Sequence, residues 1–294
     1  MWSRTSKQCI GLALHRDGLV ATEAERSAHG MRATWARRFE TGPCFDATGA
    51  LRPEALGPAL SGVAEHVGRR FLPLRVALPD PLVTMRVFEL DALPAGYRAR
   101  QDLAAWRMAR DLDTRTEALV CTHQYLGEDT GRHLLLVVGV PGALMAGLGG
   151  SLKAAGVFAV HADAAAAHRF NATAARHEAH QAWLVLEADY WTLSISDEQS
   201  RLRHLRSRWR TPGGSLQEEM REVSEETERA LLAYGQGNAA RQVACLQVTG
   251  AEAERNALSE QLSGRPWAAF EFPAAEAAGV ECGSFASVAA AIWQ

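Results

Sequence analysis

The sequence has no excess of positive charge and few cysteines. Its formal net charge is −3, and 22% of its 294 residues are charged. This balance argues against a nucleic-acid-binding protein that relies on bulk positive charge, and we expect no nucleic-acid partner. Cysteines that are odd in number and form no CxxC pair favour a reducing compartment, where thiols serve as small apolar side chains. They are Cys9, Cys44, Cys121, Cys245 and Cys282.

The motifs of several enzyme classes are also absent. The chain contains no G-x-S-x-G, no G-x-x-x-x-G-K-[ST] and no H-E-x-x-H, which argues against an α/β-hydrolase, a P-loop NTPase and a zincin. The opening residues, MWSRTSKQ, are not followed by the apolar stretch of an export signal. We therefore expect a cytoplasmic protein.

One long apolar run lies at residues 134–160, where Lys153 is the single charged residue. Pro141 and several glycines interrupt it, so we interpret it as strand, helix and strand and reject a membrane span. On this interpretation residues 134–140 and 157–161 are buried parallel strands, because such strands are continuously apolar. Residues 143–155 form the helix between them.

The chain contains two similar stretches that each predict three antiparallel strands. Residues 183–210, WLVLEADYWTLSISDEQSRLRHLRSRWR, alternate apolar strands with polar turns, and residues 9–40 repeat the pattern. Single cores stop growing at about 250 to 300 residues, so 294 residues allow two domains. We predict an α/β protein with one domain at 1–175 and the other at 176–294.

The rest of the first half predicts alternating helices and strands. A helix from Pro53 to Phe71 follows the first three strands, with Pro53 at a favoured first helical position. Strands at 74–78 and 82–90, a helix at 95–113 and a strand at 118–126 predict a small β-α-β insert, about 73–131. The chain then rejoins the first sheet at Leu134.

In the second half, Ser215 and Glu218 form an S-x-x-E capping box, which predicts a helix to about Tyr234. A strand at 243–248, a helix at 251–262 and a strand at 267–272 follow. We also expect a helix of small residues at 163–173, capped by Asp163, and another at 284–292.

Each half thus has the layout of the actin-like ATPase fold, an RNase H-like duplicated fold. Several segments resemble the PilM family of type IV pilus assembly proteins in order and spacing. They are VALPDPLVTMRVFELDALP at 76–94, LKAAGVFAVHADAAAAHRF at 152–170, WLVLEADYWTLSI at 183–195, VTGAEAERNALSEQL at 248–262 and the closing SVAAAIWQ. The cytoplasmic domain of GspL, from the related secretion systems, is similar too.

This resemblance implies a cytoplasmic scaffold of a type IV pilus, MSHA-type or type II secretion assembly platform, held at the inner membrane. It implies that the chain binds the N-terminal tail of a PilN-like inner-membrane protein, in a groove beside the insert, and other platform subunits. Leu78, Pro79, Val83 and Met85 are our candidates for lining that groove. Core packing is the alternative role for them.

Nucleotide-binding members of the family need two facing Asp-x-Gly turns, in which the aspartates place Mg²⁺ and water and the glycines admit phosphates to backbone N–H groups. The matching places in the first hairpin hold Ala13, His15 and Val20 instead of aspartate, glycine and lysine. In the second, one register puts Val185 and Glu187 there.

A register shifted by two residues puts Glu187 and Asp189 at these places instead. Neither register provides a glycine. The adenosine-side loop keeps Gly250 alone, which is more often a plain turn. We therefore expect no cofactor and a pseudo-ATPase without catalytic residues.

Two further groups of residues have more than one interpretation. The arginines of residues 201–210 form a basic patch that either pairs with the glutamate-rich helix after it or contacts anionic lipid or an acidic partner. They are Arg201, Arg203, Arg206, Arg208 and Arg210, and their alternation breaks at His204-Leu205, which predicts a bulge or a change of face. The second group lacks closed metal-ligand spacing, so we expect no metal there. It comprises His161, Asp163, His168, His177 and His180.

Two other functions remain open. An active actin-like ATPase or kinase would bind ATP–Mg²⁺ between the domains and would rebuild its phosphate site from residues such as Asp17, Glu187 or Asp189. A generic α/β protein without duplicated halves would be unrelated to pili.

Overall fold

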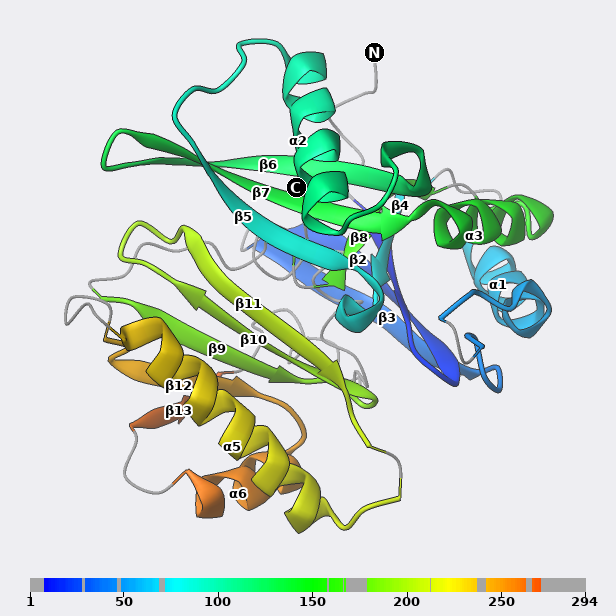
Figure 1. The fold of residues 1–294 in the computed structure, drawn as a ribbon. Helices are drawn as coiled ribbons and strands as arrows, with labels where there is room; N and C mark the ends of the chain where they lie inside the picture. Colours follow the sequence, from blue (N-terminus) through cyan, green and yellow to red (C-terminus); the bar gives the residue numbers. More distant parts are fainter. Residues whose placement is uncertain are drawn as a thin grey trace.

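The computed structural model has two five-stranded sheets and a three-stranded one (Figure 1). It describes residues 8–27, 30–46, 49–68, 72–157, 159–165, 167, 179–211, 213–236, 242–262 and 266–270.

The first domain is built on the sheet β3-β2-β1-β4-β8. Its antiparallel part consists of β1 (Gln8–Leu14), β2 (Gly18–Ser27) and β3 (Gly30–Glu40). β4 (Leu74–Leu78) and β8 (Ala159–Ala164) continue it in parallel. The three-strand prediction for residues 9–40 is confirmed.

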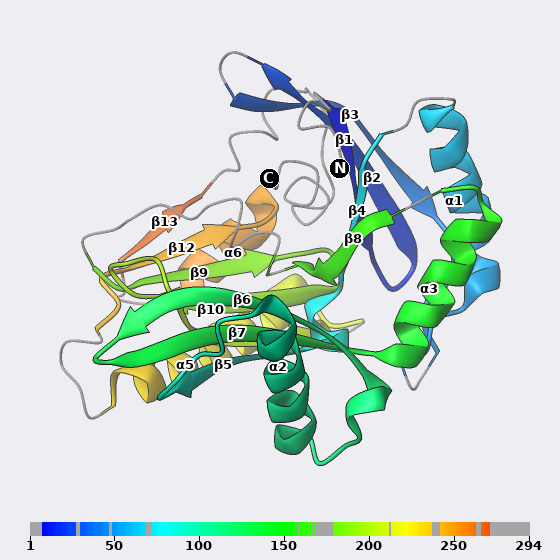
Figure 2. The ribbon, with the colours of Figure 1, turned by 90° about the horizontal axis from the view of Figure 1, so that it is seen from above.

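Two helices cover the first sheet on the side away from the second domain (Figures 1 and 2). They are α1 (Pro53–Val67), with Pro53 in its first turn as predicted, and α3 (Gly142–Ala154). Apolar side chains of both helices, including Leu56, Leu60, Leu144 and Leu148, pack with those of β1 and β4 in one buried core. An apolar helix stripe on a sheet supplies most of the driving force for such a layer.

The second domain repeats this topology in the sheet β11-β10-β9-β12-β13. Its antiparallel strands β9 (Gln181–Leu186), β10 (Tyr190–Ser196) and β11 (Leu202–Trp209) confirm the prediction for residues 183–210. β12 (Cys245–Thr249) and β13 (Trp267–Ala269) are parallel to β9 and to each other.

The helices α5 (Leu216–Gly235) and α6 (Glu252–Gln261) cover this sheet. The predicted capping box is present, since Ser215 Oγ accepts the Glu218 N–H and the Glu218 carboxylate accepts the Ser215 N–H. The β10–β11 pairing carries an irregularity at Ile195–Ser196, which faces His204 and Leu202. The strand therefore has a bulge, as one of the two alternatives predicted, but the extra residue is Arg203, just before the His204-Leu205 step at which it was expected.

The insert differs from its prediction. It has a 3₁₀ turn η1 (Asp80–Leu82), β5 (Thr84–Leu90), α2 (Tyr97–Asp111), a 3₁₀ turn η2 (Thr116–Ala118), β6 (Leu119–Asp129) and β7 (Arg132–Pro141). Its sheet has the order β5-β7-β6 and is antiparallel throughout. The expected boundaries 73–131 are wrong, because β4 belongs to the first sheet and β7 to the insert.

The error has a physical cause. β7 is the central strand of the insert and is buried on both faces: Leu135 and Val137 pack with α2, whereas Leu136 and Val138 join the core of the first domain. A strand buried on both faces is continuously apolar whether its neighbours are parallel or antiparallel. The apolar run at residues 134–140 therefore indicated a buried strand but not the sheet to which it belongs. We assigned it to the first sheet as a parallel strand, whereas it is antiparallel in the sheet of the insert.

Asp163 also differs from its prediction, because it lies inside β8 instead of capping a helix. Its carboxylate accepts hydrogen bonds from Thr122 Oγ1 of β6, at 2.9 Å, and from the Ala164 N–H. It thus joins the insert to the first sheet. Most of the predicted helix 163–173 and the whole of the predicted helix 284–292 lie outside the described residues.

Candidate functional site: the facing hairpin turns

The two domains meet where the β1–β2 turn faces the β9–β10 turn. The turns have equivalent hydrogen bonds: the His15 N–H donates to the Gly18 carbonyl and the Glu187 N–H donates to the Tyr190 carbonyl, both at 2.9 Å. His15 therefore corresponds to Glu187, and two residues earlier Ala13 corresponds to Val185. This is the first of the two registers considered from the sequence.

The equivalence extends to the residues that follow. The N–H of Thr41, after β3, donates to the Asp17 carbonyl at 3.0 Å, and the N–H of Arg210, after β11, donates to the Asp189 carbonyl at 2.9 Å. Asp17 and Asp189 thus occupy the same place in the two turns. Tyr190 stands where the first hairpin has Gly18.

The Asp189 carboxylate bridges the two domains. One oxygen contacts Nδ1 of His15 at 2.9 Å, and the other accepts the backbone N–H of Arg16 at 2.6 Å. His15 is fully buried and the Asp189 side chain is 11% exposed, so little water competes for these bonds. The Arg16 N–H is therefore not available to a phosphate while this contact holds.

The Asp189 contact favours the charged form of His15. Burial lowers its pKa, but the hydrogen bond and negative charge of Asp189, together with the charge of Glu187, outweigh burial. The pKa of His15 is therefore raised above its ordinary value.

The Tyr190 side chain fills the space between the domains. It is 1% exposed and packs against Ala13, Ala77 and Ala165, which lie at the ends of the first domain's strands. Trp209 meets it edge-on, with ring centroids 6.0 Å apart. Small residues on one domain thus receive a large ring from the other, and this buried apolar contact holds the two turns together.

Arg210 fills the second-domain side of the same region. Its guanidinium donates to the Glu187 carbonyl at 2.8 Å and forms ion pairs with Glu219 of α5 and Glu254 of α6. Burial lowers the pKa of Arg210, but the two carboxylates outweigh burial and raise it. The guanidinium is thus held between the two helices beside the second turn.

Gly250 lies next to this cluster for a packing reason. A Cβ on Gly250 would be 2.9 Å from the Leu186 Cβ and 3.2 Å from an oxygen of Glu254. The close approach of β12 to β9 therefore explains the glycine without a nucleotide. Ala13, Val20 and Val185 are buried strand residues, and Glu187 is buried beside Arg210.

The residues predicted to line a partner groove are largely inaccessible. Leu78 and Met85 belong to the first domain's core, Pro79 is buried, and Val83 is half-buried against that core. These four residues lie at the end of β4, at the start of β5 and between the two strands, and they expose little surface to a partner. Core packing, the alternative role, is the one the structure gives to Leu78, Met85 and, in part, Val83.

The five arginines of residues 201–210 are all paired with carboxylates. Arg206 and Arg208 contact Glu226 of α5, and Arg210 contacts Glu219 and Glu254. Pairing with the glutamate-rich helix is therefore the arrangement observed for this half of the patch.

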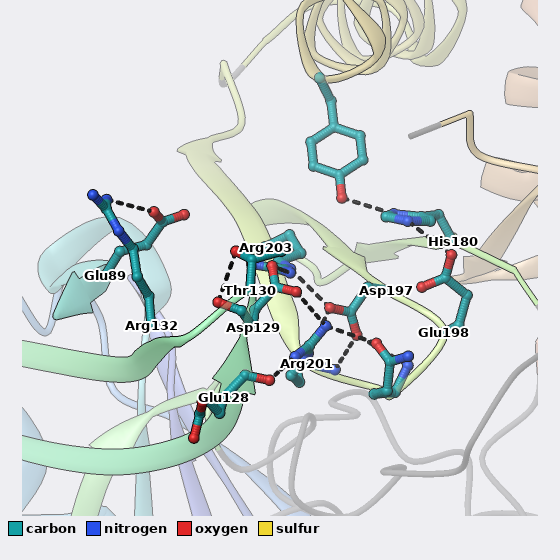
Figure 3. Close-up of polar contacts among 12 residues, drawn as sticks. Glu89, Glu128, Asp129, Thr130, Arg132, His180, Asp197, Glu198, Arg201 and Arg203 are labelled. Carbon is teal, nitrogen blue, oxygen red and sulfur yellow. Dashed lines mark hydrogen bonds and ion pairs between the residues drawn. The ribbon is translucent and has the colours of Figure 1, made fainter. Parts of the chain in front are cut away.

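Arg201 and Arg203 form a latch between the second domain and the insert (Figure 3). Both pair with Asp197 in the β10–β11 turn, at 2.7 and 2.8 Å, and with Asp129 at the tip of the β6–β7 hairpin. Arg201 also donates to the Glu128 carbonyl. The hydrogen bond from Arg203, together with the charges of both arginines, lowers the pKa of Asp129.

His180, one of the histidines considered for a metal, has other partners. His180 contacts the Tyr234 hydroxyl at 2.8 Å and the Glu198 carboxylate at 3.3 Å (Figure 3). His168 and His177 lie outside the described residues. Over the part of the chain that is described, no group of three or more potential ligands gathers in a geometry that could hold a metal ion.

Several interdomain contacts were not predicted from the sequence. Arg16 and Tyr190 were not singled out, and neither was the buried bond from Thr192 Oγ1 to Asp80 at 2.6 Å. The one available signal was an aspartate at the same distance from the first strand in both hairpins, at positions 17 and 189. Their different roles depend on the facing domain.

No protein-family model matches this sequence, and no curated protein does. Solved structures match its fold. A PilM–PilN type IV pilus biogenesis complex superposes with a TM-score of 0.76 at 14% identity, covering 96% of this chain and 97% of that one. A Bacteroides thetaiotaomicron protein with an actin-like ATPase fold and unknown function superposes with a TM-score of 0.55 at 10% identity, covering 94% of each chain.

The cytoplasmic domain of EpsL, an inner-membrane component of the Vibrio cholerae type II secretion system, also matches. Its TM-score is 0.50 at 12% identity, and the match covers 86% of this chain and 94% of that one. The chain therefore has the actin-like fold that its duplicated hairpins predicted, and the prediction of an α/β actin-like protein is confirmed.

Replacing Asp189 with asparagine tests the contact between the turns. Because the folded pKa of His15 is raised, its contribution to stability is complete below the unfolded value of about 6.5 and is lost as pH rises through the folded value. Asp189→Asn removes the charge that raises this pKa. We expect the variant to lose about 1 to 3 kcal/mol at pH 6. Its melting temperature should also fall less than that of the wild type between pH 6 and 9.

Asp17→Asn is the matched control, because Asp17 occupies the same place in the first turn but is exposed and pairs with Arg38 alone among the ion pairs found. It should change stability by less than about 0.5 kcal/mol. An identical pH profile for the wild type and Asp189→Asn in calorimetry would contradict the assignment.

Asp129→Asn tests the latch. Losing the carboxylate removes the partner of Arg203 on the insert and leaves Arg201 with the Glu128 carbonyl alone there, so amide hydrogen exchange at the β6–β7 tip should accelerate several-fold. Glu89→Gln is the control, because Glu89 pairs with Arg132 within the insert at an exposed site (Figure 3). Equal exchange at the tip in the two variants would mean that the latch does not hold the insert.

Proposed function

We propose that this protein is a PilM-like scaffold of a type IV pilus or related secretion assembly platform, which holds other subunits and does not hydrolyse ATP. One observation carries the proposal. The PilM–PilN complex superposes over almost the full length of both chains with a TM-score of 0.76, whereas the EpsL domain and the Bacteroides thetaiotaomicron protein have TM-scores of 0.50 and 0.55. Both domains and the insert are therefore included in that likeness.

The arrangement of the turns supports the absence of hydrolysis. Nucleotide phosphates would need the backbone N–H groups of the turns, and the Arg16 N–H is bound by Asp189. Asp17 and Asp189, whose carboxylates could otherwise place Mg²⁺, are bound by Arg38 and by His15 with the Arg16 N–H. The residues present do not fit ATP–Mg²⁺ while the turns are in contact.

The proposed partner is the N-terminal tail of a PilN-like membrane protein, and a hollow beside the insert is its docking place. This hollow, of about 330 Å³, lies between β5 of the insert and the second domain. Val87, His204, Ala233 and Tyr234 contribute apolar and aromatic surface to it, and Glu89 and Arg203 contribute charge. Such a mixture suits a short peptide with an apolar anchor.

Attachment to the inner membrane would then come from the partner. None of the helices in the described segments combines the length and the apolar character needed to cross a bilayer. The proposed position is therefore at the cytoplasmic face, with the platform subunits assembled around the chain.

Ala233→Arg tests this docking place. Ala233 is exposed on α5 and lines the hollow, so an arginine there fills it without entering a core. We expect a synthetic peptide with the sequence of the N-terminal tail of a PilN-like protein from the same organism to bind the wild type at micromolar concentration. It should bind the variant at least tenfold more weakly. Fluorescence anisotropy measures both.

Leu232→Arg is the matched control, because Leu232 is the adjacent exposed residue and is not among those that line the hollow. If both variants weakened tail binding equally, the hollow would not be the docking place. If the tail did not bind the wild type, the proposed scaffold function would be wrong. Calorimetry with ATP and Mg²⁺ should show no saturable heat. Tight binding would instead favour an active ATPase.

A further inference from the structure

A cavity of about 680 Å³ lies between the domains, beside the facing turns. Its walls come from both domains: the β1–β2 turn and the β3–α1 loop on one side, the β9–β10 turn and the β11–α5 loop on the other, and Leu82 of η1. This volume is within the range of ligand-binding sites, about 300 to 1,000 Å³.

Arg16 brings a positive charge that has no direct ion-pair partner to this cavity. Its guanidinium lies over the Trp209 ring, 4.5 Å from the centroid, and donates one hydrogen bond to the Arg210 carbonyl at 3.3 Å. Within the described residues it forms no ion pair. By contrast, the other arginines near the domain interface each contact one or two carboxylates. These are Arg38, Arg201, Arg203 and Arg210.

The stacking on Trp209 makes Arg16 suitable for binding a carboxylate. The indole face holds the guanidinium plane in one orientation, so the fork of N–H donors is ordered before a ligand arrives. An ordered fork binds a planar carboxylate through two parallel hydrogen bonds.

The rest of the cavity offers apolar surface and exposed backbone. Pro43, Phe45 and Leu82 provide the apolar part. Gly213 and Gly214 also line it, and a Cβ at either position would meet no atom within 4 Å. Gly213 has a φ of +89°, a conformation that favours glycine, and neither glycine carries a side chain that would cover the backbone at this wall of the cavity. An extended peptide needs such accessible backbone groups.

The charges around the cavity disfavour a ligand with more than one negative charge, because four carboxylates and three arginines line it. Asp17, Asp189 and Glu219 each have a basic partner, in Arg38, His15 and Arg210, and Asp46 accepts the Ala50 N–H. Arg16 is the lining guanidinium for which no ion pair is found in the described part of the chain. A polyanion would bring several charges close to these carboxylates and would be repelled.

We propose that this cavity binds an extended peptide segment in which an acidic residue adjoins an apolar one. The acidic side chain pairs with the Arg16 guanidinium, and the apolar neighbour packs on Phe45 and Leu82. The site is separate from the hollow beside the insert and does not depend on the proposed scaffold function. Because its walls belong to both domains, the bound segment also joins them.

The test uses the full chain and two probes, acetyl-Leu-Glu-Leu-amide and acetyl-Leu-Gln-Leu-amide, in isothermal titration calorimetry up to several millimolar. We expect the glutamate peptide to bind the wild type and the glutamine peptide to bind at least tenfold more weakly. Arg16→Gln should weaken binding of the glutamate peptide by about 10- to 100-fold, since a hydrogen bond to a charged group is lost.

Arg37→Gln is the matched control, because Arg37 also lies over an aromatic ring, that of Phe39, but does not line the cavity. It should bind the glutamate peptide like the wild type. Thr211→Trp fills the cavity from an exposed position and leaves the interdomain bonds intact, so it should abolish binding with an unchanged melting temperature even if Arg16→Gln loosens the domains.

Three results would overturn the proposal. The first is no saturable binding of the glutamate peptide to the wild type. The second is equal binding of the two peptides, or an Arg37→Gln effect as large as that of Arg16→Gln. The third is tighter binding of inorganic phosphate or ATP than of the glutamate peptide, lost in Arg16→Gln, which would make the cavity a site for free anions.

Discussion

The contact of the Asp189 carboxylate with His15 and the Arg16 N–H is the interaction on which the relation between the two domains depends. It joins residues 173 and 174 positions apart in the chain, in a place with almost no access to water. Around it the other interdomain contacts converge: Tyr190 packs on the first domain's strand ends, and Arg16 stacks on Trp209. The Asp189 carboxylate thus binds the Arg16 N–H, a backbone donor of the β1–β2 turn.

Through the Asp189 contact, the second of the two duplicated hairpins binds the turn of the first. Asp17 and Asp189 occupy equivalent places, yet Asp17 faces solvent and Arg38, whereas Asp189 faces the other domain. The difference comes from what lies opposite each turn. The Asp189 contact holds the second domain against the first domain, and the ion pairs of Arg201 and Arg203 with Asp129 hold it against the insert. A rigid arrangement of three parts suits a protein that positions others.

Local patterns in the sequence predicted the parts of this fold that depend on local physics. Strand alternation located both hairpin units, and the Ser215–Glu218 box located the start of α5, because side-chain period and capping chemistry are properties of neighbouring residues. The insert was misjudged at β7, since burial on both faces removes the alternation that distinguishes sheet partners. The exposure of Leu78 and Met85 was also overestimated, because both side chains pack in the first domain's core, Leu78 from the end of β4 and Met85 from β5 of the insert.

The candidate site was predictable only in its location. Ala13, His15 and Glu187 indicated turns without the usual phosphate chemistry, but nothing local indicates that Tyr190 fills the gap or that Arg210 lies between two glutamates from different helices. Such contacts depend on how the domains face one another, over sequence separations that a local pattern does not encode. The arginines of β11 illustrate the same point, because their charges are neutralised by carboxylates from α5, α6 and the insert.

The most direct test of the central claim, that the two turns are held together by the protein's own side chains, is the distance between the domains with and without nucleotide. Spin labels at Glu65→Cys on α1 and Glu222→Cys on α5, both exposed positions, report it in a chain with Cys245 and Cys282 replaced by serine. Pulsed electron paramagnetic resonance should give one narrow distance distribution that millimolar ATP–Mg²⁺ leaves unchanged in the wild type. A distribution that is broad, or that shifts when ATP–Mg²⁺ is added, would contradict the account.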